Sequence, residues 1–168
     1  PLLYALIVLL IDKHLHRLHT GWFVLPIPVF LFLYLAKQIP FIAREGIFIH
    51  SIPWIPSLGI NYTTYVDGLS LIFGLIILGV GALVTHYSIY YLVKDREELG
   101  NFYVYLLLFM GAMLGVVFSD NVLVLYLFWE LTSISSFLLI AFWYQRKGSR
   151  HGAQRALLIT IFGGFAML

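Results

Sequence analysis

The sequence predicts an all-α integral membrane protein with five to six transmembrane helices, and three observations lead to this prediction. The 168-residue chain is 61% hydrophobic and 11% charged, whereas an ordinary soluble domain is nearer half apolar and a quarter charged. The apolar residues form long runs that short polar stretches separate. The basic residues are concentrated in alternate polar stretches. A chain with so few polar residues cannot cover a globule in water, so we expect it to lie in a bilayer.

Both ends of the chain fall inside apolar runs. The sequence begins at Pro1, without a methionine, in PLLYALIVLLI, and it ends at Leu168 in ALLITIFGGFAML. A helix needs roughly 20 apolar residues to cross a bilayer, and both terminal runs are shorter. The first run also lacks the basic region and the small-residue cleavage site of a signal peptide. We therefore expect a piece of a longer polypeptide.

Six helical segments are expected, of which the first and last are incomplete. Their predicted ranges are about 1–11, 22–42, 69–92, 101–118, 121–144 and 152–168. Pro26 and Pro28 fall in the first turn or two of the second segment, where a missing backbone donor costs least. Asp67 precedes the third segment as an N-cap candidate, and Ser119 and Asp120 are the cap candidates for the fifth.

The linker at residues 44–66 is longer than the others. It contains prolines, glycines and several residues that favour β-strands. This composition predicts a short hairpin-like segment between the second and third helices, lying on the membrane face. An irregular interfacial loop is the alternative.

The basic residues predict the orientation of the chain. Eight of the ten lysines and arginines lie in three of the predicted loops, at residues 12–20, 93–100 and 145–155. If the segments alternate in direction, the opposite side receives only Lys37 and Arg44. Cytoplasmic loops are enriched in Lys and Arg, so the three basic loops are predicted to be cytoplasmic. Segment 44–66 and Asp120 are predicted to be extracellular.

Glu130 is the only acidic residue in the apolar run 121–144. It lies about ten residues into its helix, which places it within roughly 5 Å of the middle of the span. A charge there costs about 2.5–3.5 kcal/mol, while the Val, Leu, Ile and Phe residues of the run contribute roughly −4 to −8 kcal/mol. The helix can therefore insert with its glutamate. Acids at such positions usually face a bundle interior or a hydrated cavity and mark an ion or proton path; a static strut is the alternative.

Hydroxyl side chains surround Glu130 on its helix. They belong to Tyr126, Thr132, Ser133, Ser135 and Ser136. Tyr126 and Ser133 share the helix face of Glu130, at spacings of four and three residues. They either line a hydrated cavity next to the carboxylate or donate to the carbonyls of their own helix.

Histidine and arginine residues give weaker candidates. His86 lies in an apolar segment, and a histidine exchanges protons near neutral pH; a hydrogen bond between helices is the alternative. Arg155 and His151 lie near the start of the last segment, where snorkelling to the interface is the simpler interpretation. A small histidine cluster is interpreted as solvated rather than as a metal site, and it comprises His14, His16 and His19. The sequence has no cysteine, so thiolate metal sites and disulfides are excluded within this chain.

Six stretches together resemble one family of membrane proteins. They are VDGLS at 66–70, HYSIYYL at 86–92, NFY at 101–103, SDNVLVLYLFWE at 119–130, SSFLLIAFWY at 135–144 and GAQRALLIT at 152–160. The combination resembles the antiporter-like subunits of respiratory complex I and of Mrp-type cation/proton antiporters, over about residues 44–168. The stretch WELTSISSFLLIAFWY, together with the later stretch ALLITIFGGFAML, is most similar in sequence to the large A subunit of the Mrp type.

The resemblance implies that the chain is the N-terminal part of a larger antiporter-like helical bundle. It also implies that Glu130 is the family's membrane-embedded acid on the fifth helix, which works against a lysine on a seventh helix beyond this chain. The family's basic residue at the start of the sixth helix falls on Arg155, where lysine is more usual. The largest complex I subunit commonly has T-R-x-G-D where this chain has Thr-Ile-Phe-Gly-Gly at 160–164. This difference favours the Mrp type. It also means that this chain has no carboxylate at position 164.

The function implied is that of one subunit of a multi-subunit complex in the cell membrane that exchanges Na⁺ for H⁺, a secondary transporter rather than an enzyme. Glu130 would be the proton-binding switch, with His86 and Arg155 as relay or tuning groups and Ser133 and Tyr126 as polar lining. No cofactor and no nucleic acid are expected; the partners are other subunits, lipid and the two ions. The alternatives are a proton-pumping, non-redox subunit of complex I and a purely structural scaffold.

Overall fold

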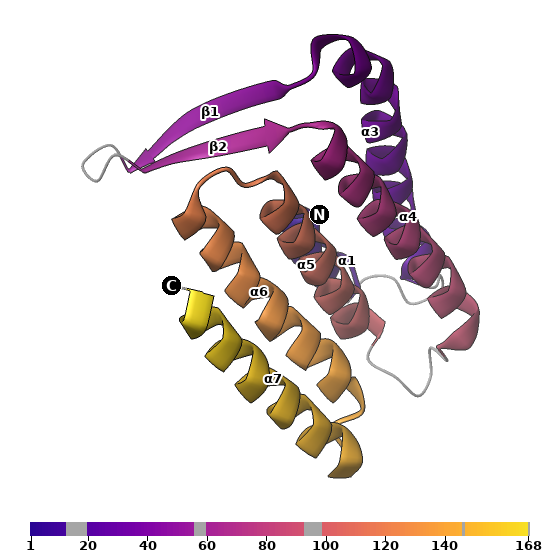
Figure 1. The fold of residues 1–168 in the computed structure, drawn as a ribbon. Helices are drawn as coiled ribbons and strands as arrows, with labels where there is room; N and C mark the ends of the chain where they lie inside the picture. The colour runs from indigo at the N-terminus through magenta and orange to yellow at the C-terminus, as the bar shows by residue number, and fades with distance from the viewer. Residues whose placement is uncertain (13–19, 56–59, 93–98, 146, 168) are drawn as a thin grey trace.

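Helices and one β-hairpin make up the described part of the computed structural model, residues 1–12, 20–55, 60–92, 99–145 and 147–167 (Figure 1). The helices are α1 (Leu2–Asp12), α2 (Gly21–Val24), α3 (Pro26–Glu45), α4 (Gly68–Tyr91), α5 (Leu99–Phe118), α6 (Val122–Ile140) and α7 (Lys147–Met167). The strands are β1 (Phe48–Ile55) and β2 (Ile60–Val66), and a short 3-10 helix, η2, spans Ala141–Trp143. The predicted helical membrane fold with a small hairpin is confirmed.

Four helical segments of the described chain are long and apolar enough to cross a membrane. They are Gly21–Arg44, which joins α2 and α3, Gly68–Tyr91, Leu99–Phe118 and Val122–Trp143. The chain is therefore a multi-pass membrane protein. Helix α1 has 11 residues, too few to span a bilayer alone. Helix α7 starts at Lys147, five residues before the predicted start at 152, and its first turns are polar.

The helices are arranged around α5. Helices α5, α6 and α7 lie side by side in chain order, α3 packs along α4, and α1 packs against α5 (Figure 1). Helix α4 also contacts α5, so α5 lies between α4 and α6. The hairpin and the starts of α4 and α6 lie at one end of the bundle, and the starts of α5 and α7 lie at the other (Figure 1).

Polar N-caps begin the helices at the hairpin end. Asp67 caps α4, because its carboxylate accepts a 2.7 Å hydrogen bond from the N–H of Ser70, whose hydroxyl accepts a 2.8 Å bond from the N–H of Asp67. This confirms the predicted cap. The prediction of Ser119 or Asp120 as the cap of α6 is wrong. The cap is Asn121, whose side-chain oxygen accepts hydrogen bonds from two N–H groups of the first turn; a cap must directly precede that turn to reach them.

The hairpin predicted within residues 44–66 is present. Strand β1 pairs antiparallel with β2. The chain leaves α3 through Gly46, whose φ of 82° a residue with a side chain rarely adopts. The N–H of Asp120 donates to the carbonyl of Thr63 at 3.3 Å. This bond ties the hairpin to the loop between α5 and α6.

The buried core is small and is centred on α5. Large apolar side chains on the outer faces remain exposed, among them Leu83 at 70% and Phe162 at 71%. Such surface is unfavourable in water and suits lipid or further helices. The core cluster contains Ala5, Val8, Val24, Leu92, Leu99, Tyr103, Val104, Leu106, Leu107 and Met110.

Candidate functional site

Glu130 lies near the middle of α6, as its place in the apolar run predicted. The residue as a whole is partly exposed, and no acidic side chain of the described residues is fully buried. One carboxylate oxygen, Oε1, is buried and has no hydrogen-bond partner among the described residues. A buried polar oxygen without a partner is costly. The carboxyl group therefore has one oxygen whose burial no described residue compensates.

The α7 backbone covers this oxygen. A methyl group built on Gly164 would overlap Oε1 of Glu130 and would lie 3.5 Å from its Cδ atom and 3.5 Å from Cδ1 of Trp129. Gly164 itself is buried. The carboxyl group thus occupies the space that a side chain at Gly164 would fill, and the indole of Trp129 would be in ordinary contact with that side chain.

Tyr126 and Ser133 lie on the same helix as Glu130 but have different surroundings. The phenol of Tyr126 interacts with the carboxylate of Glu130 across one turn. Ser133 is buried, and its hydroxyl donates to the carbonyl of Trp129 at 3.3 Å. The hydroxyls of Ser135 and its neighbours likewise donate to carbonyls of α6. The sequence left two interpretations open for these hydroxyls, and the structure shows the second, in which they donate to carbonyls of their own helix.

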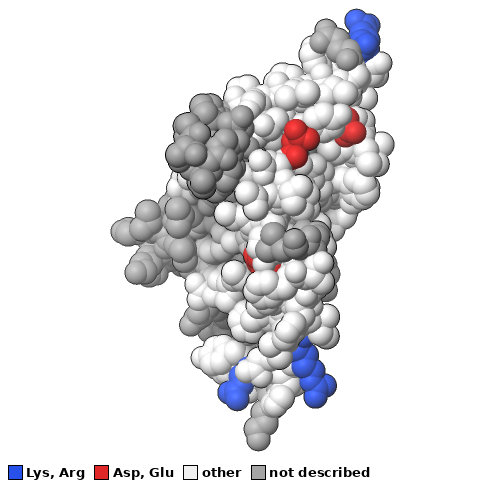
Figure 2. Space-filling model, turned by 60° about the vertical axis from the view of Figure 1, so that its left-hand side comes forward, with Lys and Arg blue, Asp and Glu red and all other residues white. Residues whose placement is uncertain are grey.

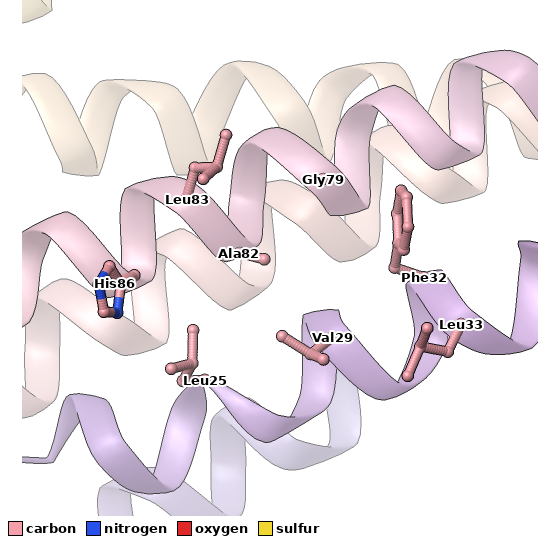
Figure 3. A pocket seen from close by; sticks show the side chains of 8 residues that line it. All are labelled: Leu25, Val29, Phe32, Leu33, Gly79, Ala82, Leu83 and His86. Carbon is pink, nitrogen blue, oxygen red and sulfur yellow. The ribbon is translucent and has the colours of Figure 1, made fainter.

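His86 lies apart from Glu130. It is exposed on α4 and lines an apolar groove of about 460 Å³ between α3 and α4 (Figure 3). Its ring makes an edge-to-face contact with Tyr90, with ring centroids 5.4 Å apart. The groove is also lined by Leu25, Val29, Phe32, Leu33, Gly79, Ala82 and Leu83. Because α5 lies between α4 and α6, the structure does not bring His86 and Glu130 together.

Arg155 is exposed on α7. It precedes Gly164 by nine residues, which corresponds to roughly 13 Å along the helix axis. Arg155 is therefore not beside the Glu130 carboxyl group. Its neighbour His151 is also exposed and lies one turn nearer the start of α7.

The charged side chains lie mostly at the ends of the molecule. Figure 2 shows acidic side chains near one end, a further and partly covered one about midway, and basic side chains at both ends. The predicted basic loops at 12–20 and 93–100 fall largely outside the described residues, as do His14, His16 and His19. Within the described ranges, no three His, Asp or Glu side chains come together as a metal site.

Family models and individual relatives both match this chain. Residues 53–103 match the model described as the N-terminus of complex I chain 5, and residues 119–168 match that of the transmembrane region of NADH:quinone oxidoreductase and Mrp antiporters. Over all 168 residues, the chain is 58% identical to the A subunit of the Na⁺/H⁺ antiporter of Alkalihalophilus pseudofirmus and 55% identical to the A1 subunit of that of Staphylococcus haemolyticus. The chain belongs to the antiporter-like family that Mrp A subunits share with complex I.

The relatives of this antiporter-like chain are much longer. The chain spans 21% of the length of each of these two relatives. It is also similar to a chain in the structure of the Mrp complex from Dietzia sp., with a TM-score of 0.83 and 34% identity, covering 97% of this chain and 17% of that one. A chain of the archaeal membrane-bound sulfane sulfur reductase shares the fold, with a TM-score of 0.78 and 20% identity, over 99% of this chain and 25% of that one.

The neighbourhood of Glu130 includes two residues that were not predicted as part of the site. Gly164 of α7 lies against the carboxyl group, and Trp129 of α6 lies beside Gly164. Gly164 was singled out from the sequence only as the position where the resemblance to the largest complex I subunit implied an acid. In the fold this position lies directly against Glu130.

Proposed function

We propose that the chain is the N-terminal part of the A subunit of a multi-subunit Mrp-type antiporter, which exchanges Na⁺ for H⁺ across the cell membrane. Identity to two antiporter proteins of this type along the whole of the chain supports the proposal. The fold shared with a chain of the Mrp complex supports assembly with other subunits. The protein is then part of a secondary transporter rather than an enzyme, with lipid, other subunits and the two ions as its partners.

The observation that carries the proposal is the unpartnered oxygen of Glu130 in the middle of α6. Burial disfavours an ionised carboxylate, and a nearby cation favours it. In this proposal the carboxyl group of Glu130 exchanges a proton in concert with a cation, the role that the resemblance gives to the family's lysine on a later helix.

The other candidates act more remotely in this proposal. Tyr126 borders the carboxylate directly, and Ser133 forms part of the same helix face. Arg155 and His86 lie toward the other end of the bundle and tune or connect the site from the side of the basic loops. We propose that this side, with loops 12–20, 93–100 and 145–155, is cytoplasmic and that segment 44–66 is extracellular.

Replacing Glu130 by Gln tests the proposal directly. In inverted vesicles carrying the complete complex, Glu130→Gln is expected to abolish Na⁺-dependent proton movement nearly completely, because the amide has a similar shape and cannot exchange a proton. Asp120→Asn is the matched control, because Asp120 is exposed just before the same helix, and it should retain activity. Copurification of the subunits reports assembly. Full activity in an assembled Glu130→Gln complex would exclude the proton-binding role and support a scaffold.

The second candidate function is a proton-pumping subunit of complex I. The match of residues 53–103 to the complex I chain 5 model favours it. Proton movement that is independent of Na⁺ and requires quinone reduction elsewhere in the complex would support this candidate. The gene neighbourhood separates the two as well, since Mrp-type genes or quinone and iron–sulfur subunits would lie alongside.

A further inference from the structure

Two adjacent glycines on α7 have opposite environments. A methyl group on Gly164 would overlap Oε1 of Glu130, whereas a methyl group on Gly163 would meet no atom within 4 Å. Gly164 is buried and Gly163 is exposed. Alanine favours a helix over glycine equally at both positions. Contact with Glu130 therefore requires glycine at position 164, whereas no described residue requires glycine at position 163.

The elements packed around Glu130 offer Oε1 no charged partner. Helices α5 and α7 and the short helix η2 pack against α6, and the sequences of α5 and η2 contain no charged residue. On α7 the nearest charged residue to Gly164 is Arg155, roughly 13 Å away along the axis. On α6 itself, Tyr126 interacts with the carboxylate one turn away, but Oε1 has no donor among the described residues.

The position against Gly164 thus leaves one oxygen of the carboxyl group buried and without a donor among the described residues. In general, a buried oxygen without a donor costs less free energy as the carbonyl of a protonated carboxyl group than as part of an anion. Contact with the α7 backbone also excludes water from this oxygen. The close approach at Gly164 creates this environment, because any side chain there would displace the carboxyl group.

We propose that Gly164 is a positioning residue, which lets the carboxyl group of Glu130 lie against α7 with one oxygen free of hydrogen bonds. This inference deepens the proposed function, since it rests on Glu130 as the proton-binding group. A side chain at position 164 displaces the carboxyl group from this enclosed space, so that Oε1 is no longer shielded from hydrogen-bond donors. The same side chain at position 163 leaves the carboxyl group in place.

Infrared difference spectroscopy of the full-length protein in its lipid-reconstituted complex tests the position of the carboxyl group. The C=O stretch of the protonated group is assigned by its loss in Glu130→Gln. It is expected at the high frequency of a carbonyl without a hydrogen bond. Gly164→Ala should move it to lower frequency, because the displaced group gains hydrogen bonds, and Gly163→Ala should leave it unchanged. Na⁺-dependent proton movement should fall on the order of tenfold in Gly164→Ala alone, as expected for misplacement of a reacting group.

Two results would overturn the positioning role. One is an unchanged C=O band in an assembled Gly164→Ala complex, and the other is the absence of any protonated Glu130 band in the parent protein over its working pH range. The first result leaves the proton-binding role of Glu130 intact, so it separates failure of this inference from failure of the proposed function, whereas the second result would overturn both.

A third variant keeps the test decisive if Gly164→Ala fails to assemble. The double variant Glu130→Ala, Gly164→Ala removes the side chain that the new methyl group would strike. Restored assembly supports contact between Gly164 and the Glu130 carboxyl group. Assembly that stays absent in the double variant overturns it.

Discussion

The α6–α7 pair and the α3–α4 pair each carry one titratable side chain within a helix, but the two pairs pack differently around it. At α6–α7 the backbone of Gly164 lies against the carboxyl group of Glu130, and Oε1 is buried without a partner among the described residues. At α3–α4 an apolar groove of about 460 Å³ lies between the helices, and His86 is exposed at its edge (Figure 3).

The difference shows that a titratable residue in an apolar helix is defined by what packs against it. His86 is exposed, lines an open groove and makes a ring contact with Tyr90 of its own helix. Glu130 is partly exposed, but its Oε1 is buried against the backbone of α7 at Gly164. A group whose solvation is restricted responds strongly to an approaching charge. The comparison therefore favours α6–α7 as the proton-binding region and gives α3–α4 a lesser role.

The largest expected effect tests this ranking. Glu130→Gln should abolish Na⁺-dependent proton movement, whereas His86→Gln should reduce it only a few-fold, well short of the factor of about 10²–10⁴ that a direct acid–base group supplies. The two substitutions are compared in the same vesicles at matched complex content. An inactive His86→Gln complex that assembles normally would reverse the ranking and place the essential proton exchange at α3–α4.

The next effect concerns packing and is expected in stability. A methyl group on Gly115 of α5 would overlap the ring of Phe128 of α6, whereas one on Gly79 of α4 would lie 3.4 Å from the ring of Phe32. The overpacking caused by Gly115→Ala should cost about 1–3 kcal/mol of stability. The higher helix propensity of alanine should offset about 1 kcal/mol of this cost. Gly79→Ala should be neutral or stabilising, because the groove accepts the methyl group. Thermal unfolding of the complex in detergent measures both.

Equal melting temperatures for the two glycine variants would contradict the comparison. They would mean that the α5–α6 contact yields as easily as the groove side of α3–α4. A Gly115→Ala variant that loses stability but keeps its transport rate per assembled complex would sharpen it, by separating packing at α5–α6 from chemistry at Glu130.

The sequence was sufficient for the helices and for the place of Glu130 near the middle of a span, and insufficient for the surroundings of Glu130. The apolar runs predicted the spans because bilayer thickness sets their length, and Glu130 stood out as the single acid in its run. That Gly164 faces it depends on how α7 packs on α6, which no local pattern encodes. The cap of α6 was placed one or two residues early, because Ser119, Asp120 and Asn121 all suit the position and only the backbone selects Asn121.

A smaller effect is expected at Ser133. Its hydroxyl donates to the carbonyl of Trp129, so it is engaged with its own helix rather than with Glu130. Ser133→Ala should change Na⁺-dependent proton movement by less than about twofold, since a helix gains little from such a bond. If instead the rate falls as far as in Gly164→Ala, the hydroxyl takes part in proton transfer and the polar-lining interpretation is correct.

The smallest effect should come from Asp67, the N-cap of α4. This residue precedes the helix and lies outside the contacts of Glu130 and His86 that the comparison concerns. The N–H of Ser70 donates to the carboxylate of Asp67 and lowers the pKa of that carboxyl group. A lowered pKa means that the cap stabilises the folded state at pH values above the unfolded pKa, about 4. This contribution is lost as the pH falls through the pKa of the folded state.

The substitution Asp67→Asn retains an oxygen acceptor that does not titrate. The melting temperature of this variant should therefore depend less on acid pH than that of the parent protein. Thermal unfolding between neutral and acid pH measures this difference, and transport at neutral pH should be unchanged. A loss of transport in Asp67→Asn at full assembly would show that the hairpin end takes part in ion movement, which the packing of the two helix pairs does not suggest.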